Sequence, residues 1–409
     1  MTNKADLPRT VSGGHPSERP SGTAVYVQVP FCPERCDYCA IPVTASLSQT
    51  GKYLAALEGE LSRVRPFLSE NPPLSLYIGG GSPTSLPTKD LKIIVDSFST
   101  YFKQAGEVTF ESRPEALTEE KIALLGTIPR LRLSVGMESL DPASLASLGR
   151  RGPLLSPLSL LERLKSRLDA AVSMDFICTG EGFDEEEFLA VTGELLAQGL
   201  DHLSVYPLVI EKRTVLSLRK EQGQTDEALE DRAAENWRRV CQGLARQGWL
   251  RYEVSNFARD PERICRHNLH VWKGGDYLGL GPGAHQKVGV VRYENVRSIV
   301  EYVDIVLNEG RHPMAARECL SERERDTETL YTNLRLSSGI SIPWILDRTD
   351  NDRTLGVMEE LVRIGLAEID RTNYGSFVLS EEGLFVLDEI AFRLLALFPD
   401  GDLDAEIGA

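Results

Sequence analysis

The sequence is poor in long apolar runs and in positive charge. No apolar stretch in the 409 residues approaches the length of about 20 residues that a transmembrane helix needs, so we expect no stable insertion into a membrane. Lysine and arginine number 45 against 61 aspartates and glutamates, which gives a net charge of −16. Binding to nucleic acid needs a basic surface, and anionic membranes repel negative charge. We therefore expect neither as a partner.

Cysteine is also sparse, with seven residues, and this odd count argues against a set of disulfides. The first residues lack the apolar segment of a secretory signal. Free thiols favour a reducing, cytoplasmic location. Residues 1–23 are rich in Thr, Ser, Gly, Pro and mixed charge, which predicts a disordered tail, and 399–409 predict an acidic tail.

Three of the cysteines, Cys32, Cys36 and Cys39, are spaced C-x3-C-x2-C directly after an apolar segment that predicts a buried strand. A short loop at the end of a strand can aim three thiolates at one point, and thiolates select zinc, copper(I) or iron–sulfur clusters. Structural zinc needs four ligands, and no fourth Cys or His lies near this loop in the sequence. A cubane cluster held by three cysteines keeps one iron open, and we favour this hypothesis.

Apolar, β-rich segments alternate with helical patterns along the first half of the chain. The expected strands cover 24–30, 74–78, 107–111, 131–136, 171–178 and 202–207. The expected helices cover 51–67, 88–102, 116–125, 156–168, 184–198 and 225–247. Repeated βα units predict a parallel sheet, and six units are too few for the closed eight-fold barrel. Residues at the C-terminal ends of such strands are expected to carry the chemistry.

A series of motifs in one order carries a family resemblance. The Cys motif, with an aromatic before its last Cys, resembles the radical S-adenosylmethionine (SAM) superfamily. The surrounding VYVQVPFCPERCDYC resembles the branch that holds oxygen-independent coproporphyrinogen III dehydrogenase and the HemW heme chaperones. Further motifs of this branch follow at 75–84, 132–140, 203–208, 252–258, 267–272 and 275–285.

The resemblance implies an α/β fold with an open, partial (β/α)6 barrel over 24–225. It also implies a barrel-closing extension over 226–317 and a small α+β, winged-helix-like C-terminal domain over 318–398. A wing suggests nucleic acid, but the acidic composition argues against that partner.

The cofactors that the resemblance implies are a [4Fe–4S] cluster on Cys32, Cys36 and Cys39 and a SAM molecule on the open iron. An electron donor such as flavodoxin or ferredoxin would reduce the cluster. The implied SAM contacts are Tyr26, Tyr38, Gly80, Gly81, Ser82 and Glu111. Glycines let the backbone approach a ligand closely, although a glycine triplet by itself is more often a tight turn.

The residues alone leave other roles open for these positions. Glu111 could form an ion pair with Arg113 or Arg132, and the two tyrosines could simply pack in the core. Three more positions, Glu138, Arg150 and Asp175, match contacts to a second SAM in the dehydrogenase.

Glu138 stands where the family has Gln, which replaces an amide donor by an anion. An ion pair between Arg150 and Asp175 is the alternative to the second-SAM hypothesis.

The segment His267–Trp272 resembles the HNxxYW motif that is linked to heme in the chaperones, with Val271 in place of the Tyr. We predict His267 as an axial ligand of heme iron, with His270 or Cys265 as further possibilities. A purely structural role for His267 is the alternative.

The predicted function is that of a HemW-like protein that binds a cluster, SAM and heme, and hands heme to an unknown acceptor. One alternative is the coproporphyrinogen III dehydrogenase, against which Ile41 argues, because that enzyme has a fourth Cys there. The other is a HemN-like methyltransferase that uses two SAM molecules. The sequence leaves open whether the protein is an enzyme.

Overall fold

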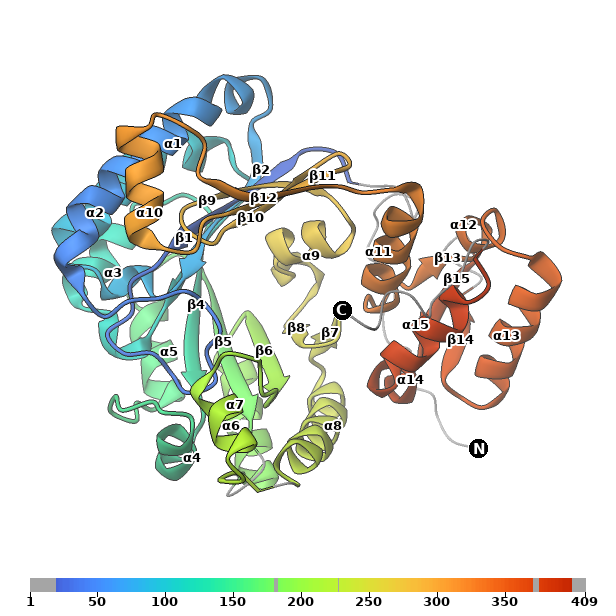
Figure 1. Cartoon of the computed structure of the whole chain (residues 1–409). Coiled ribbons are helices and arrows are strands. Elements are labelled where there is room, and N and C mark those ends of the chain that lie inside the picture. Colours follow the sequence, from blue (N-terminus) through green and yellow to red (C-terminus); the bar gives the residue numbers. More distant parts are fainter. Residues whose placement is uncertain (1–19, 180–182, 227, 371–374, 399–409) are drawn as a thin grey trace.

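The structure is a computed structural model that describes residues 20–179, 183–226, 228–370 and 375–398 (Figure 1). The tail predicted at 399–409 lies outside these residues, as do residues 1–19 of the tail predicted at 1–23. Residue Thr23 already belongs to the first strand.

Six parallel strands in sequence order form the body of the fold (Figure 1). These strands are β1 (Thr23–Val29), β2 (Pro73–Gly80), β3 (Glu107–Ser112), β4 (Leu131–Glu138), β5 (Ala171–Cys178) and β6 (His202–Pro207). Each pairs in parallel with the next, and the sheet does not close from β6 back to β1. The predicted strands and the open, partial barrel are therefore confirmed.

Helices connect these strands. They are α1 (Thr50–Glu70), α2 (Thr88–Gln104), α3 (Glu119–Leu125), α4 (Pro142–Ser147), α5 (Pro157–Lys165) and α6 (Glu185–Ala197). Helix α2 buries Leu91, Ile94, Val95 and Phe98, a spacing of three and four residues that gives one apolar face. The sequence did not predict the short helix α4.

Strands from the second half of the chain extend the sheet at both edges. Strand β9 (Asp276–Leu280) pairs in parallel with β1, and β10 (His285–Val288), β11 (Val291–Asn295) and β12 (Met314–Cys319) follow it. At the other edge β8 (Asn256–Ala258) pairs antiparallel with β6, and β7 (Leu250–Arg251) pairs with β8. The same half of the chain also contains the helices α7 (Val215–Glu221), α8 (Leu229–Gln247) and α10 (Ile299–Val303).

The chain between β8 and β9 crosses the N-terminal end of the barrel. It contains α9 (Arg266–Trp272), which contacts β1, β2 and β9. The guanidinium of Arg132, at the start of β4, donates to the carbonyl oxygens of Arg263 and Ile264. We call residues 259–272 the floor segment, because they cover the end of the barrel opposite to the cysteine loop.

The C-terminal unit has a core of its own, which includes Leu330, Leu334, Phe377 and Leu394. Its elements are α11 (Glu322–Leu334), β13 (Ile340–Ser341), α12 (Ile342–Leu346), α13 (Asn351–Arg363), β14 (Ala367–Asp370), β15 (Ser376–Leu379), α14 (Glu381–Phe385) and α15 (Leu387–Leu395). The three strands form an antiparallel sheet in the order β13-β15-β14. The sequence predicted α11, two further helices and one β segment. Within the described residues, four helices follow α11 and three strands are present, which is two helices and two strands more than expected. The domain boundaries stay predictions.

Among the helices of the described residues, none combines the length and the apolar character needed to cross a membrane.

Candidate functional site

The loop that carries the three cysteines follows β1 and is anchored by backbone hydrogen bonds. The N–H of Cys32 donates to the carbonyl oxygen of Thr44 (3.1 Å), and the N–H of Thr44 donates to that of Pro30 (2.9 Å). Further along the loop, the N–H of Asp37 donates to the carbonyl oxygen of Leu148 (2.8 Å), which follows α4. The loop is thus held by contacts within itself and to the barrel.

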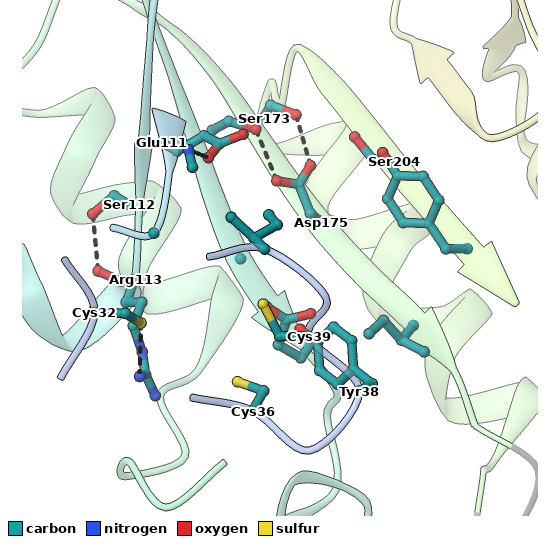
Figure 2. Close-up of a pocket in the computed structure, with 18 of the residues that line it drawn as sticks. Cys32, Cys36, Tyr38, Cys39, Glu111, Ser112, Arg113, Ser173, Asp175 and Ser204 are labelled. Carbon is teal, nitrogen blue, oxygen red and sulfur yellow. Dashed lines mark hydrogen bonds between the residues drawn. The ribbon is translucent and has the colours of Figure 1, made fainter. Parts of the chain in front are cut away.

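The three thiols line one cavity of about 540 Å³ that extends from this loop into the barrel (Figure 2). Cys32, Cys36 and Cys39 are half-buried and free. Burial raises the pKa of Cys36 to about 12 and that of Cys39 above its ordinary value. Thiols with such pKa values are protonated at neutral pH, and metal binding must displace those protons.

Glu111 is the penultimate residue of β3 and lies in the cavity wall next to the glycine segment of β2. The hydroxyl of Tyr77 donates to its Oε1 (2.7 Å), and the backbone N–H of Gly80 donates to its Oε2 (2.8 Å). Gly80 has a φ of 106°, and a Cβ there would lie 2.4 Å from the side chain of Gln28. The position therefore requires glycine. Burial raises the pKa of the Glu111 carboxyl above its ordinary value.

The alternative ion pairs for Glu111 are wrong. The Arg113 guanidinium lies 2.7 Å from Oε1 of Glu34, and the Arg132 guanidinium lies 2.9 Å from Oε2 of Glu107. Each arginine is thus already paired with another carboxylate. Glu111 keeps its remaining lone pairs for the cavity.

The other residues predicted to contact SAM differ in their placement. Gly81 and Tyr38 line the cavity with Glu111, whereas Tyr26 and Ser82 are not among its lining residues. The Tyr26 hydroxyl donates to Oε1 of Gln28 (2.7 Å), and the Ser82 hydroxyl oxygen accepts from a backbone N–H in the loop after β3 (3.3 Å). Roles for these two side chains in binding SAM remain predictions, and the observed contacts are structural.

Glu138, Arg150 and Asp175 all line the cavity. Nη1 of Arg150 lies 2.7 Å from Oε1 of Glu138. Asp175 instead accepts hydrogen bonds from the hydroxyls of Ser134 (2.8 Å) and Ser173 (3.4 Å), and burial raises its pKa to about 6. The alternative ion pair between Arg150 and Asp175 is therefore wrong.

Below the cysteine loop the cavity wall is polar, which sequence reasoning missed. The lining residues on β3 to β6 include Thr109, Ser134, Ser173, His202 and Ser204. Figure 2 shows Ser173 and Ser204 near Asp175, at the far end of the view from Cys36. The available signal was a polar residue at every second position of strands that otherwise read as apolar, a period that places these side chains on one face.

Comparisons with known proteins agree on one family. The Radical SAM superfamily is matched over residues 26–195. The heme chaperone HemW of Mycobacterium tuberculosis (strain H37Rv) is 32% identical over 326 residues, which is 78% of this chain and 83% of the relative. The mitochondrial radical S-adenosyl methionine domain-containing protein 1 of Mus musculus is 30% identical over 95% of this chain and 91% of the relative.

The chain belongs to the HemW/HemN-like radical SAM family. A solved structure in this family, coproporphyrinogen III oxidase (HemN) from Escherichia coli, superimposes with a TM-score of 0.73 at 18% identity. The superposition covers 92% of this chain and 91% of that one. At this level of identity the match shows the fold, which agrees with the partial barrel described above.

The cofactors of this family are a [4Fe–4S] cluster and SAM, and the residues present fit both. Cys32, Cys36 and Cys39 face one cavity and supply three thiolates, which leaves one iron of a cubane open. Within the described ranges, no three His, Cys, Asp or Glu side chains converge closely enough for a single metal ion. A cubane binds each thiolate to a different iron, so it tolerates wider spacing. When bound, the pair supplies radical chemistry by one-electron cleavage of the sulfonium, and the protein supplies orientation.

His267, which the sequence predicts as a heme ligand, lies in the floor segment, away from the cysteine loop. His267 is buried, with Nδ1 3.0 Å from the Ser75 hydroxyl and its ring 5.0 Å from that of Tyr77. Burial lowers its pKa to about 3, so the imidazole is neutral. The alternative His270 is also buried, and its Nε2 lies 2.9 Å from the carbonyl oxygen of Asp276.

Proposed function

We propose that this protein binds heme beside its cluster and SAM site and passes the heme to an acceptor protein. The curated relatives of this family in Mycobacterium tuberculosis and Bacillus subtilis are named heme chaperone HemW. An external one-electron donor such as a flavodoxin or ferredoxin would reduce the cluster.

The observation that carries the proposal is an apolar rim around the mouth of the cavity. Ile41, Tyr206 and Val209 line the cavity and yet expose 39%, 40% and 54% of their surface. Exposed apolar side chains that cluster at a cavity mark ligand-binding surfaces, and a porphyrin offers a large apolar face. Arg35, exposed at the same mouth, supplies a positive charge for a propionate group.

The rim and His267 are two different places for heme. A porphyrin reaches the rim directly, whereas His267 is buried and is not among the residues that line the cavity. We place the heme at the rim, and the ligand role of His267 is the second possibility that the experiment decides.

The experiment is an anaerobic titration of the reconstituted protein with hemin, followed by absorbance. Val209→Asp introduces a charge at an exposed rim position. It is expected to weaken heme binding about tenfold, because burial of a valine side chain is worth about 1.5 kcal/mol. Val300→Asp is the matched control, because Val300 is 65% exposed on α10 and does not line the cavity. It is expected to bind heme like the wild type.

The variant His267→Ala separates the two places. Normal heme binding in His267→Ala with weakened binding in Val209→Asp supports the rim. The reverse pattern assigns the heme to the floor segment. Absence of heme binding by the wild type would overturn the heme function altogether, and product analysis with coproporphyrinogen III would then test the enzymatic alternative.

A further inference from the structure

An arginine that the family motifs do not single out lies against a cysteine of the cluster loop. Nη1 of Arg113 is 3.8 Å from Sγ of Cys32, within hydrogen-bonding reach of a sulfur acceptor (Figure 2). The Arg113 side chain is only 7% exposed. Its charge is permanent, and burial limits screening by salt.

Two carboxylates hold this guanidinium in place. Nη2 donates to Oε1 of Glu34 (2.7 Å), which lies in the cysteine loop itself between Cys32 and Cys36. Nε lies 2.6 Å from Oε1 of Glu115, two residues further along the chain from the arginine. Glu34 Oε1 also accepts from the backbone N–H of Arg151 (2.9 Å). The side chain is therefore fixed on both sides, and its third nitrogen is aimed at the sulfur.

We propose that Arg113 is a positioning residue that sets the reduction potential of the cluster through an N–H···S hydrogen bond to Cys32. Reduction adds one electron to the cluster, and no bond in the protein forms or breaks. A fixed positive charge next to a ligand sulfur favours the more negative, reduced state, and hydrogen bonds to the sulfurs are among the factors that set such potentials. Glu34 opposes part of this effect, because it places a negative charge on the same guanidinium. The proposal concerns the cluster and is independent of heme binding.

Substitutions of Arg113 and Glu34 are expected to shift the midpoint potential of the cluster in opposite directions. Arg113→Gln removes the positive charge, so the cluster becomes harder to reduce. Glu34→Gln removes the opposing negative charge and leaves the arginine, so the cluster becomes easier to reduce. A residue that merely holds the loop in shape would not give shifts of opposite sign.

The test is a redox titration of the reconstituted cluster without SAM, followed by the electron paramagnetic resonance signal of the reduced state. At the wild-type midpoint, Arg113→Gln is expected to lower the ratio of reduced to oxidised cluster about tenfold, which corresponds to about 59 mV for one electron. Arg113→Lys keeps the charge, and its midpoint is expected to fall between those of the wild type and Arg113→Gln. Iron and sulfide content are measured in every variant.

Arg297→Gln is the matched control. Arg297 also holds the cysteine loop, through Nη2 to the carbonyl oxygen of Ala40 (3.0 Å), but it is half exposed and bonds no sulfur. It is expected to leave the midpoint unchanged. Equal midpoints in wild type and Arg113→Gln, or shifts of the same sign in Arg113→Gln and Glu34→Gln, would overturn the proposal. If Arg113→Gln fails to hold a cluster, Glu34→Gln decides alone: an upward shift supports the proposal and an unchanged midpoint overturns it.

Discussion

The carboxylate of Glu138 and the guanidinium of Arg150 form a buried ion pair, with Oε1 and Nη1 2.7 Å apart. Nη2 of the same arginine lies 3.6 Å from Oε2 of Glu115. Glu138 has a φ of 67° at a register shift between β4 and β5, a backbone conformation that costs a residue other than glycine about 1–3 kcal/mol. The guanidinium that matches a second-SAM contact is thus already neutralised from within the protein.

We therefore predict that the wild-type protein binds one SAM molecule per chain. Glu138→Gln restores the family's amide and removes the nearer of the two carboxylates that contact Arg150, so a second, weaker site is expected to appear. Equilibrium dialysis of the reconstituted protein with labelled SAM measures both stoichiometries. Two sites of similar affinity in the wild type would refute the prediction and revive the two-SAM methyltransferase hypothesis.

Cys36→Ser is expected to abolish formation of a stable cluster, because a hydroxyl is a harder and much less acidic ligand than a thiol. The measurement is iron and sulfide per chain after anaerobic reconstitution, together with the absorbance of the cluster. Cys319→Ser is the control, since Cys319 is exposed and lies outside the cavity, and it should reconstitute fully. An unchanged iron content in Cys36→Ser would remove this residue from the ligand set.

The strands and the positions of Cys32, Gly80 and Glu111 were predictable because each depends on local information. Apolar, β-branched segments at regular intervals give the strands, and residues in the last positions of a strand or just after it lie at its C-terminal end. The site is built at such ends. One sequence was therefore enough to place these residues around a common cavity.

The pairing of charges was not predictable from the sequence, because it depends on which side chains of distant segments meet. Glu111 has Tyr77 and Gly80 as partners where arginines were equally plausible, and Arg150 pairs with Glu138 across a register shift. The place of His267 in the fold was not predictable for a related reason. Strand β8 has only three residues and runs antiparallel to β6, so the chain after it reaches the floor of the barrel. No local sequence pattern predicts this path.

Glu111→Gln is expected to weaken SAM binding about 10–100-fold, because hydrogen bonds to charged groups are worth about 1.5–3 kcal/mol. The carboxylate faces the cavity with both oxygens oriented by Tyr77 and Gly80. Calorimetric titration of the cluster-loaded protein with SAM under anaerobic conditions gives the affinity. Glu359→Gln, an exposed position on α13, serves as control. A wild-type affinity in Glu111→Gln would show that SAM does not contact this carboxylate.

A second buried carboxylate, Glu60 of α1, joins the helix to the edge strands and α10. It accepts hydrogen bonds from the Tyr302 hydroxyl (2.6 Å), the Gly281 N–H (2.8 Å) and the Asn295 amide (2.8 Å). Burial outweighs these three donors and raises the pKa of Glu60 to about 7. The folded protein therefore binds a proton at Glu60 more tightly than the unfolded chain does.

This difference in pKa predicts how stability depends on pH. Between the unfolded pKa, near 4.5, and the folded pKa, near 7, the folded state binds more protons at Glu60. The contribution of this residue to stability is therefore fully present below pH 4.5 and is lost as the pH rises towards 7, by about 3 kcal/mol in total.

Urea unfolding of the cluster-free protein at a series of pH values measures the free energy of unfolding. Glu60→Gln cannot titrate, so its free energy of unfolding should fall less with pH than that of the wild type, whereas the exposed control Glu70→Gln should follow the wild type. The same pH slope in Glu60→Gln and wild type would mean that the Glu60 carboxyl is ionised in the folded protein throughout this range, and that its three hydrogen bonds, and not its burial, set its charge.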